Sequence, residues 1–510
     1  MKTRTKARTT GLAEQERGRS QGREKSGPRR LTDGGRIGAA RLGVALGLAL
    51  GLGLTGDAAA MQKQHRSTCE DTGIVDAEKP WDRIQPSKAS ACLAASGQEL
   101  LDHVNDPTCA TIVLTSQDYE LPATHFSPYL RIQRPIEIWG TGAATTRLRF
   151  GVEFRPSIGV PGASGSALRG VTVQPVPGAL PSSPGTAVPI PNSPFVNGAA
   201  IVGWEPSDPL AGELRDITLE DVRVEGGGWL GVGIQGTAPR GAHLRRVEVN
   251  HVTQFGVNVR NIRAAQLNVV DRAILEDIRV EGVNDTACFL DDPELCPFPG
   301  SHQIGIWIGA SHTQLSRAWV RDVFWTGIAT GRVIHDVPYV VSGASLRDLD
   351  VDGVGTSANG FDAGRGPGVG IYFERILRDS TLTRFCVGPN TERGVNVEWN
   401  KNEVGLGSGR FRVTNGWIAS TYYAVGFDAG TFGAYVGDIA VENAQWTALL
   451  FPSNWEQFPN PGVNSTSWDG VSVAVPVCAP GASHPAASPC TCVVSFSSYD
   501  PTGPRFCEVP

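Results

Sequence analysis

Short runs of alternating apolar and polar residues recur along the middle of this chain at nearly regular intervals. Each run opens with leucine and then places apolar residues at every second position, which is the pattern of a strand with one buried face. The copies begin at Leu214, Leu244, Leu275, Leu315 and Leu346, so the steps are 30, 31, 40 and 31 residues. A repeat of this size predicts a solenoid, because one unit cannot bury its apolar face alone and stacked units form one continuous core.

A second set of runs, each led by glycine, lies between the copies of the first. The second and fourth residues are apolar and are predicted to point inward, while the third and fifth point outward. These runs begin at Gly231, Gly256, Gly305, Gly327, Gly370, Gly394 and Gly426. Two strands per repeat, each buried on one side, predict a chain that winds as a coil. The alternative, an antiparallel sandwich, would need Asn-Gly or Asp-Gly hairpin turns between strands, and these are scarce here.

The start of the predicted solenoid resembles the right-handed parallel β-helix proteins of the pectin-lyase-like superfamily. Residues 100–104 (Leu-Leu-Asp-His-Val) resemble the short helix that caps such folds, residues 111–115 resemble the first coil, and residues 135–142 resemble a second-coil turn ending on glycines. The resemblance implies an all-β fold, a right-handed single-stranded parallel β-helix with a short N-terminal helical cap. The superfamily contains lyases, hydrolases, epimerases and non-catalytic adhesins, so the fold leaves the activity open.

Composition divides the chain into four predicted parts. They are a signal peptide (1–60), a polar lead-in (61–94), the parallel β-helix (95–451) and a Cys- and Pro-rich C-terminal cap (452–510). The first part has a basic start, an apolar run too short to span a bilayer and an Ala-Ala-Ala cleavage motif before Met61. We therefore expect a secreted, periplasmic or cell-surface protein of a bacterium, with no transmembrane segment in the mature chain.

Removal of the signal peptide changes the charge of the chain. The full sequence has 45 basic and 51 acidic side chains, and residues 1–60 carry 12 and 5 of them, so the mature chain keeps 33 and 46, a net charge of −13. This excess of acid disfavours nucleic acid as a partner, since neutralising phosphates needs clustered Lys and Arg. It also disfavours a purely anionic glycan, unless Ca²⁺ mediates the contact.

All ten cysteines lie in the predicted mature part, which agrees with an oxidising compartment. Two local disulfides are expected, Cys92 with Cys109 at the cap and Cys288 with Cys296 around an acidic loop. Two further bridges are expected among Cys478, Cys490, Cys492 and Cys507 in the last 33 residues. Spacing assigns no partner to Cys69 or Cys386. A zinc site is the alternative, but the sequence has no Cys-x-x-Cys pair.

The outward positions of the glycine-led strands gather candidate binding chemistry. Stacked coils place equivalent residues ~4.8 Å apart in columns. The predicted substrate-binding residues, all from third positions, are Asn258, Trp307, Tyr372 and Asn396. The predicted catalytic residues are Arg260, Glu374 and Glu398 from the fifth positions, a column that also holds Gln235, and Asp428 from the third. Aromatic rings beside amides and carboxylates favour sugar binding, because ring faces cover C–H groups and polar side chains take hydroxyls. The alternative is that these residues form only the solvated side of the solenoid.

Glu374 and Glu398 form the sharpest pair, because they occupy the same column in adjacent coils. Their carboxylates are expected ~5 Å apart, a separation at which one pKa rises or a cation is recruited. The first outcome supplies an acid and a base for glycoside chemistry, and the second supplies a Ca²⁺ site. The third interpretation is plain salt bridging to Arg375, Arg378 or Lys401.

The sequence leaves two classes of function open. One is an enzyme, a polysaccharide lyase or glycoside hydrolase that acts on an extracellular polysaccharide or cell-surface glycan. The other is a non-catalytic surface, adhesion or structural protein. The stacked glutamates with Trp307 and Tyr372 favour the first class. The superfamily's Gly-His-Gly, Asn-Thr-Asp and Trp-Ile-Asp-His signatures are missing, which favours the second.

Overall fold

The computed structural model describes residues 74–84, 91–125, 127–156, 162–175, 199–203, 213–226, 230–236, 239–252, 254–261, 270–283, 303–331, 341–355, 368–374, 377–397, 412–420, 423–428, 435–442, 446–451, 471–476, 491–496 and 506–508. Among these residues no helix is long and apolar enough to cross a bilayer. The expected signal peptide at 1–60 lies outside them.

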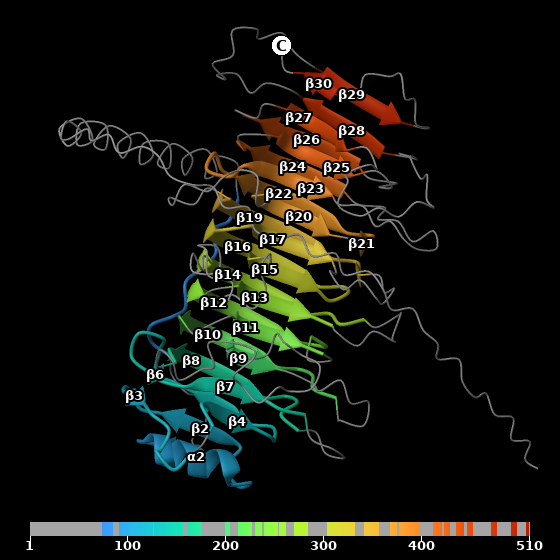
Figure 1. Cartoon of the computed structure of the whole chain (residues 1–510). Coiled ribbons are helices and arrows are strands. Elements are labelled where there is room, and N and C mark those ends of the chain that lie inside the picture. The colour runs from blue at the N-terminus through green and yellow to red at the C-terminus, as the bar shows by residue number, and fades with distance from the viewer. Residues whose placement is uncertain are drawn as a thin grey trace, which may run out of the picture. The chain divides into compact units, whose positions relative to one another are not determined.

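Two long sheets contain nearly all of the described strands (Figure 1). Sheet A comprises β1 (Cys92–Ala94), β2 (Thr111–Leu114), β3 (Asp118–Tyr119), β5 (Glu137–Trp139), β6 (Arg147–Leu148), β8 (Ala167–Val173), β10 (Thr218–Glu225), β12 (His243–Val252), β14 (Ile274–Val283), β16 (Gln314–Val323), β19 (Ser345–Val354), β22 (Thr381–Val387), β24 (Arg412–Ile418), β26 (Tyr435–Val441), β28 (Val471–Pro476) and β29 (Thr491–Phe496). Sheet B comprises β4 (Tyr129–Ile132), β7 (Gly151–Phe154), β9 (Ala199–Gly203), β11 (Leu230–Gln235), β13 (Phe255–Arg260), β15 (Ile304–Gly309), β17 (Thr326–Gly331), β20 (Val369–Glu374), β23 (Arg393–Val397), β25 (Tyr423–Asp428), β27 (Trp446–Phe451) and β30 (Phe506–Glu508). A small third sheet pairs β18 (Val341–Ser342) with β21 (Leu377–Arg378).

The chain alternates between the two sheets as it winds. From β10 to β17 each strand of sheet A is followed by one of sheet B, and each pairs in parallel with the strand one coil away. The expected right-handed parallel β-helix is therefore confirmed. At the C-terminal end the pairing changes, because β28 with β29 and β27 with β30 are antiparallel.

The core is a single column of apolar side chains inside the coils. The second and fourth residues of the glycine-led strands belong to it, as Val232 and Ile234 show. Sheet A contributes the leucine that opens each copy, such as Leu244 in β12. The predicted inward positions are thus confirmed for these runs, apart from the one at Gly426, whose register differs.

The register of the first copy differs from the sequence prediction. Leu219, not Leu214, pairs with Leu244, so the first coil is five residues shorter than expected. Both leucines are buried and both open an alternating run, so the pattern alone does not separate them. The strand pairing settles the alignment, because it places Leu219 opposite Leu244 and Asp221 opposite Arg246.

A short helix closes the N-terminal end of the core. Helix α2 (Gly97–Asn105) begins after Ser96, whose hydroxyl accepts the Glu99 N–H, while the Glu99 carboxylate accepts the Ala95 N–H. This reciprocal capping satisfies backbone donors that a helix start leaves open. Leu100 and Val104 are buried in the core, which confirms the helical cap predicted at residues 100–104.

Arg134 satisfies the other end of α2. Its guanidinium donates to the carbonyl oxygens of Val104, His103 and Cys109 at 2.7–2.9 Å. A cation is also favoured there by the partial negative charge of a helix C-terminus. The C-terminal end of α2 is thereby fixed to the loop that follows β4.

The cysteine predictions have different outcomes. The Cys92–Cys109 disulfide is confirmed, and it joins β1 to the loop before β2. Cys386, which spacing left unassigned, is also disulfide-bonded. Cys69, Cys288, Cys296, Cys478 and Cys490 lie outside the described residues, as do the side chains of Cys492 and Cys507, so these bridges stay predictions.

Each long strand of sheet A, from β8 to β26, bends at a residue in the left-handed backbone conformation. These residues occupy one register position, here called the bend ladder: Gly170, Asp221, Arg246, Asp277, Arg317, Asp348, Arg384, Asn415 and Asp438. Their φ angles lie between 51° and 62°. A non-glycine residue in this region costs free energy, so a regular series of them needs compensating contacts.

Ion pairs between neighbouring coils supply those contacts. Arg246 binds both carboxylate oxygens of Asp221 at 2.5 and 2.8 Å, and Arg317 binds both of Asp277 at 2.6 and 2.9 Å. Arg384 binds Asp348 at 2.7 Å. Paired oxygens and planar guanidinium groups are the strong form of this interaction. The hydrogen bond to Asp221 raises the pKa of Arg246 further.

Residues 74–84, here called the strap, run along the outside of the bend ladder (Figure 1, dark blue). The Glu78 N–H donates to Asp277 at 3.2 Å, and the Trp81 N–H donates to Asp221 at 3.0 Å. The Trp81 ring covers the Arg246 guanidinium at 3.9 Å. The strap therefore covers the Arg246–Asp221 ion pair and links coils that are far from it in sequence.

The two ends of the strap meet different parts of sheet A. Ile84 donates its N–H to the carbonyl of Thr141, near β5. Ile74 contacts a buried cluster made of Cys386 in β22, Trp417 in β24 and Ala419, the residue after β24. The strap thus runs from the later coils toward the first coils as its residue numbers increase, opposite to the order of the coils along the chain.

We predict that replacing Arg246 with Met destabilises the protein by about 3–5 kcal/mol, because the substitution leaves the buried Asp221 carboxylate without its cation. Arg246 is only 1% exposed, so water cannot replace it. Urea unfolding followed by tryptophan fluorescence measures the change. Adding Asp221→Asn should recover part of the loss. Arg215→Met, at an exposed arginine 3.8 Å from its nearest carboxylate, is the control and should cost under about 0.5 kcal/mol. Equal losses in the two single variants would contradict the prediction.

Candidate functional site

The outward side chains of sheet B form a surface of their own, here called the outer face of sheet B. Trp307 and Ala329 do not belong to the main core and instead form part of a separate buried cluster outside it. The other members of that cluster are Ala199, Val202, Leu230, Phe255 and Ile304, with Tyr129 and Tyr372 partly buried against it. The predicted outward direction of the third positions is confirmed for these residues.

Strand pairing brings the predicted substrate-binding residues into one column. Asn258 pairs with Trp307, Trp307 with Ala329, Ala329 with Tyr372, and Tyr372 with Asn396. The column therefore crosses five successive coils. Arg260 lies in the neighbouring column, opposite Gln235 on one side and Gly309 on the other.

The outer face of sheet B is buried rather than solvated. Asn258, Arg260 and Trp307 are each at most 3% exposed, Asn396 is 8% exposed, and Tyr372 is half-buried. The alternative that these residues form only the wet side of the solenoid is therefore wrong for the described part of the face.

Trp307 and Arg260 form a fixed unit on this face. The Arg260 guanidinium lies 4.6 Å from the centre of the Trp307 ring. The centres of the Phe255 and Trp307 rings are 5.2 Å apart, and the two ring planes are tilted by 40° to each other. The indole N–H donates to the Gly331 carbonyl at 3.2 Å. A Cβ at Gly309 would lie 2.7 Å from the Arg260 Cγ, so glycine lets the arginine stem cross that strand. The geometry favours Trp307 as a support for Arg260, while the half-buried Tyr372 is the more accessible aromatic ring.

Three amide side chains on this face have buried polar atoms with no hydrogen-bond partner among the described residues. Both polar atoms of Gln235 and both of Asn258 are in this state, as is the Oδ1 atom of Asn396. A buried amide without partners costs about 1–3 kcal/mol per group, so native proteins rarely leave such groups unsatisfied. Amides that converge on one face in this state indicate a surface that receives hydrogen bonds from a polar ligand or from water.

Gln235 is a member of this set that sequence reasoning does not select as a site residue. Alternation places it in the fifth column, but a lone glutamine carries no motif. Complete burial is the signal that distinguishes it, and burial depends on chain segments that the local pattern does not identify.

The predicted carboxylates are placed by their backbones only. Glu374 pairs with Gly331 and so continues the column of Arg260. The side chains of Glu374 and Asp428, and all of Glu398, lie outside the described residues, so their catalytic and Ca²⁺ roles stay predictions. One assignment is corrected: Asn396 pairs with Gly426 and Val397 with Phe427, so Asp428 follows in the fifth column, not the third. The glycine of this run takes the third position, which shifts the run by two residues.

A buried carboxyl group lies beside this face, next to the residue that follows Arg260. Asp271 is 2% exposed and accepts hydrogen bonds from the Asn261 side-chain amide at 3.0 Å and the Ser311 N–H at 2.8 Å. Burial raises the pKa of Asp271 from 3.8 to about 6, while these two bonds and the nearby Arg240 and His312 hold it from rising further. The sequence gives no sign of this group, because its burial depends on a neighbouring coil.

Neither a protein-family model nor a curated protein sequence matches the chain. Several solved structures are similar in fold. They include the catalytic domain of a GH87 α-1,3-glucanase in complex with tetrasaccharides (13% identity, TM-score 0.41, 76% of this chain and 70% of that one), the A-module of the mannuronan C-5 epimerase AlgE4 of Azotobacter vinelandii (13%, 0.37, 81% and 97%) and the surface adhesin PfbA of Streptococcus pneumoniae (10%, 0.35, 75% and 90%). At these identities and TM-scores the matches carry no argument about activity, which depends on the site alone.

We predict a pH-dependent stability that originates at Asp271. Because the pKa of Asp271 is raised in the folded protein, folding favours its protonated form. The contribution of Asp271 to the free energy of unfolding is therefore fully present below about pH 4 and is lost as the pH rises through about 6. The difference in unfolding free energy between wild type and Asp271→Asn should therefore fall by on the order of 3 kcal/mol across that window. Urea unfolding at several pH values measures it. A difference that stays constant from pH 4 to pH 7 would show that Asp271 does not titrate in this range.

Proposed function

We propose that this protein binds an extracellular polysaccharide along the outer face of sheet B. The observation that carries the proposal is the set of buried amides on Gln235, Asn258 and Asn396, whose polar atoms lack partners within the described part of the chain. A polysaccharide presents many hydroxyl groups, each both a donor and an acceptor, and so suits side-chain amides, which also offer both. The column direction, across successive parallel strands, suits a long chain better than a small ligand.

Aromatic and cationic groups complete the proposed binding face. Tyr372 is two coils from Trp307 in one column, roughly 10 Å away along the solenoid, and offers a half-buried ring for the C–H face of a sugar. Arg260, held on the Trp307 ring, offers N–H donors to hydroxyl or carboxylate groups. The proposed substrate-binding residues are therefore Asn258, Tyr372 and Asn396 with Gln235 added, and Trp307 positions Arg260.

We further propose that bond cleavage, by a lyase or a glycoside hydrolase reaction, takes place at the acidic end of the fifth column. Glu374 directly follows Phe373 and Asp428 directly follows Phe427, and these two phenylalanines lie two coils apart on either side of Val397. Carboxylates in adjacent coils have the separation of about 5 Å that retaining glycoside hydrolysis uses. The same three oxygen-bearing side chains would suit Ca²⁺, so the two roles need a direct test.

Action outside the cytoplasm is part of this proposal. The expected signal peptide and the even number of cysteines support it, and so does the Cys92–Cys109 disulfide, since such bonds persist in oxidising compartments. A non-catalytic surface protein that uses the same face is the second candidate, favoured by the missing catalytic signatures.

We predict that removing the amides weakens binding without weakening the fold. Gln235→Met and Asn258→Leu keep the side-chain size, so the unfolding free energy should stay equal or rise by up to about 3 kcal/mol. Affinity for the polysaccharide found in a glycan-array screen should fall at least about tenfold, or 1.4 kcal/mol. Native affinity gels and thermal unfolding measure the two effects. Asn250→Leu, which breaks a bond of 3.0 Å to Glu225 on sheet A, is the control and should leave affinity unchanged. Destabilised variants with native affinity would assign the amides to the fold.

A second prediction concerns the carboxylate column. Glu374→Gln or Glu398→Gln should abolish polysaccharide cleavage, or Ca²⁺ binding, while changing stability by no more than about 1 kcal/mol. Reducing-end and unsaturated-product assays follow cleavage, and calorimetric titration follows Ca²⁺. Glu248→Gln, at a sheet A glutamate paired with Arg223 at 2.9 Å, is the control. Activity and titrations identical to wild type would remove this column from the site and leave the binding face intact.

A further inference from the structure

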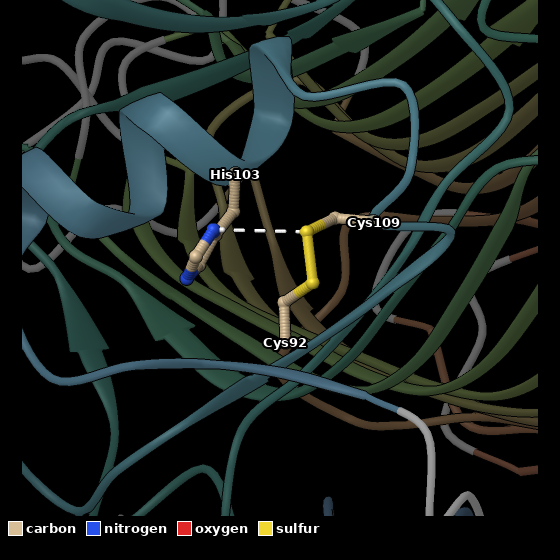
Figure 2. Close-up of side chains that lie close together, drawn as sticks. All are labelled: Cys92, His103 and Cys109. Carbon is tan, nitrogen blue, oxygen red and sulfur yellow. Dashed lines mark hydrogen bonds between the residues drawn. A yellow bond between two sulfur atoms is a disulfide. The ribbon is translucent and has the colours of Figure 1, made fainter.

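Three metal-binding side chains meet where the helical cap joins the first coil. Cys92 lies in β1, His103 in the last turn of α2, and Cys109 shortly before β2. Their ligand atoms all lie within 4.8 Å of one another (Figure 2). In this structure the two sulfur atoms are joined as the Cys92–Cys109 disulfide, so they are not available as metal ligands.

The orientation of His103 suits a metal ligand. Its Nε2 atom lies 3.0 Å from the Leu93 carbonyl oxygen, which can only accept, so in the neutral ring Nε2 carries the proton. The other nitrogen, Nδ1, then keeps its lone pair and lies 3.7 Å from the Cys109 sulfur. A hydrogen bond that fixes the tautomer and ring direction is the usual arrangement around a metal-bound histidine.

Asp106 brings a second electron-rich atom to the same sulfur. Its Oδ2 lies 3.6 Å from the Cys109 sulfur, while its Oδ1 accepts the N–H and the hydroxyl of Thr108 at 2.9 and 2.7 Å. A disulfide sulfur carries no proton to offer either neighbour. A lone pair and a carboxylate therefore face one sulfur that can donate to neither of them.

We infer that the cap disulfide and a zinc site are alternative states of the same side chains. In the reduced protein, Cys92, Cys109 and His103 bind Zn²⁺, and Asp106 or a water takes the fourth tetrahedral position. Two thiolates with one imidazole and one oxygen ligand form a recognised zinc-binding set. In either state α2 stays joined to the first coil, so the end of the core remains covered in a reducing as well as an oxidising compartment.

Conversion of the Cys92–Cys109 disulfide into the zinc site starts with a reduction that needs two electrons and two protons. A dithiol reductant gives two electrons to the Cys92–Cys109 bond, which breaks, and becomes a disulfide itself. Each protein sulfur takes up one proton. Binding of Zn²⁺ then releases both thiol protons to solvent, while His103 binds through its Nδ1 lone pair without a change in protonation.

The test uses the full chain, reduced with a phosphine that does not bind zinc, and Co²⁺ as a spectroscopic substitute. Reduced wild type should show visible d–d bands of tetrahedral cobalt and a near-ultraviolet thiolate charge-transfer band. The other cysteines also become reduced, so the informative quantity is the difference between variants. His103→Gln keeps a donor for Leu93 but offers only a weak amide oxygen to the metal. His125→Gln, at a histidine bonded to the Tyr129 carbonyl instead, is the matched control.

The expected result is loss of one tightly bound Co²⁺ per chain, or at least a tenfold weaker affinity for it, in His103→Gln and in Cys92→Ser but not in His125→Gln. Zn²⁺ should displace the Co²⁺ and raise the thermal midpoint of the reduced, but not the oxidised, wild type. Identical spectra for wild type and His103→Gln, with both proteins folded by circular dichroism, would overturn the inference. That outcome leaves polysaccharide binding by sheet B unaffected, since the two sites share no residue.

Discussion

The architecture depends on attraction between opposite charges at the bends of sheet A. A left-handed residue in each long strand turns the sheet around the coil, and stacking places these residues about one strand spacing apart. Like charges at that spacing would repel, but Asp221 meets Arg246, Asp277 meets Arg317, and Asp348 meets Arg384. Because the two carboxylates nearest the strap also accept its N–H groups, one set of charges holds both the coils and the strap.

Sheet B shows the opposite use of polar groups. Its inward positions are apolar and tightly packed, whereas its outward amides are buried without partners among the described residues. The continuous core supplies enough stability to tolerate that cost on one face. The two sheets therefore differ in their polar groups, with paired charges at the bends of sheet A and buried amides that lack described partners on sheet B.

The fold could be predicted from the sequence because its signals are local and repeated. The alternation at Val232 and Ile234 fixes which side is buried, and the Leu100–Val104 spacing fixes the cap helix. Register is harder, because Leu214 and Leu219 match the same pattern, each is followed two residues later by a left-handed aspartate, and only the strand pairing separates them. The site could be predicted in part: the Asn258–Asn396 column follows from alternation. Gln235 and Asp271 could not be selected, because their burial depends on other coils.

The strap imposes an order on the assembly of the chain. Ala77 accepts a hydrogen bond from Arg279 across 202 residues of sequence, and Glu78 binds Asp277 across 199. Contacts between neighbouring coils close loops of only a few tens of residues, so coils can form one after another during synthesis. The strap is synthesised before the coils but can dock along its whole length only after β24 exists, because Ile74 packs against Trp417. Docking of the strap is therefore a late, high-contact-order step. When the coils fold in the order of the sequence, the last contacts to form are therefore those of residues 74–84, which precede all the coils.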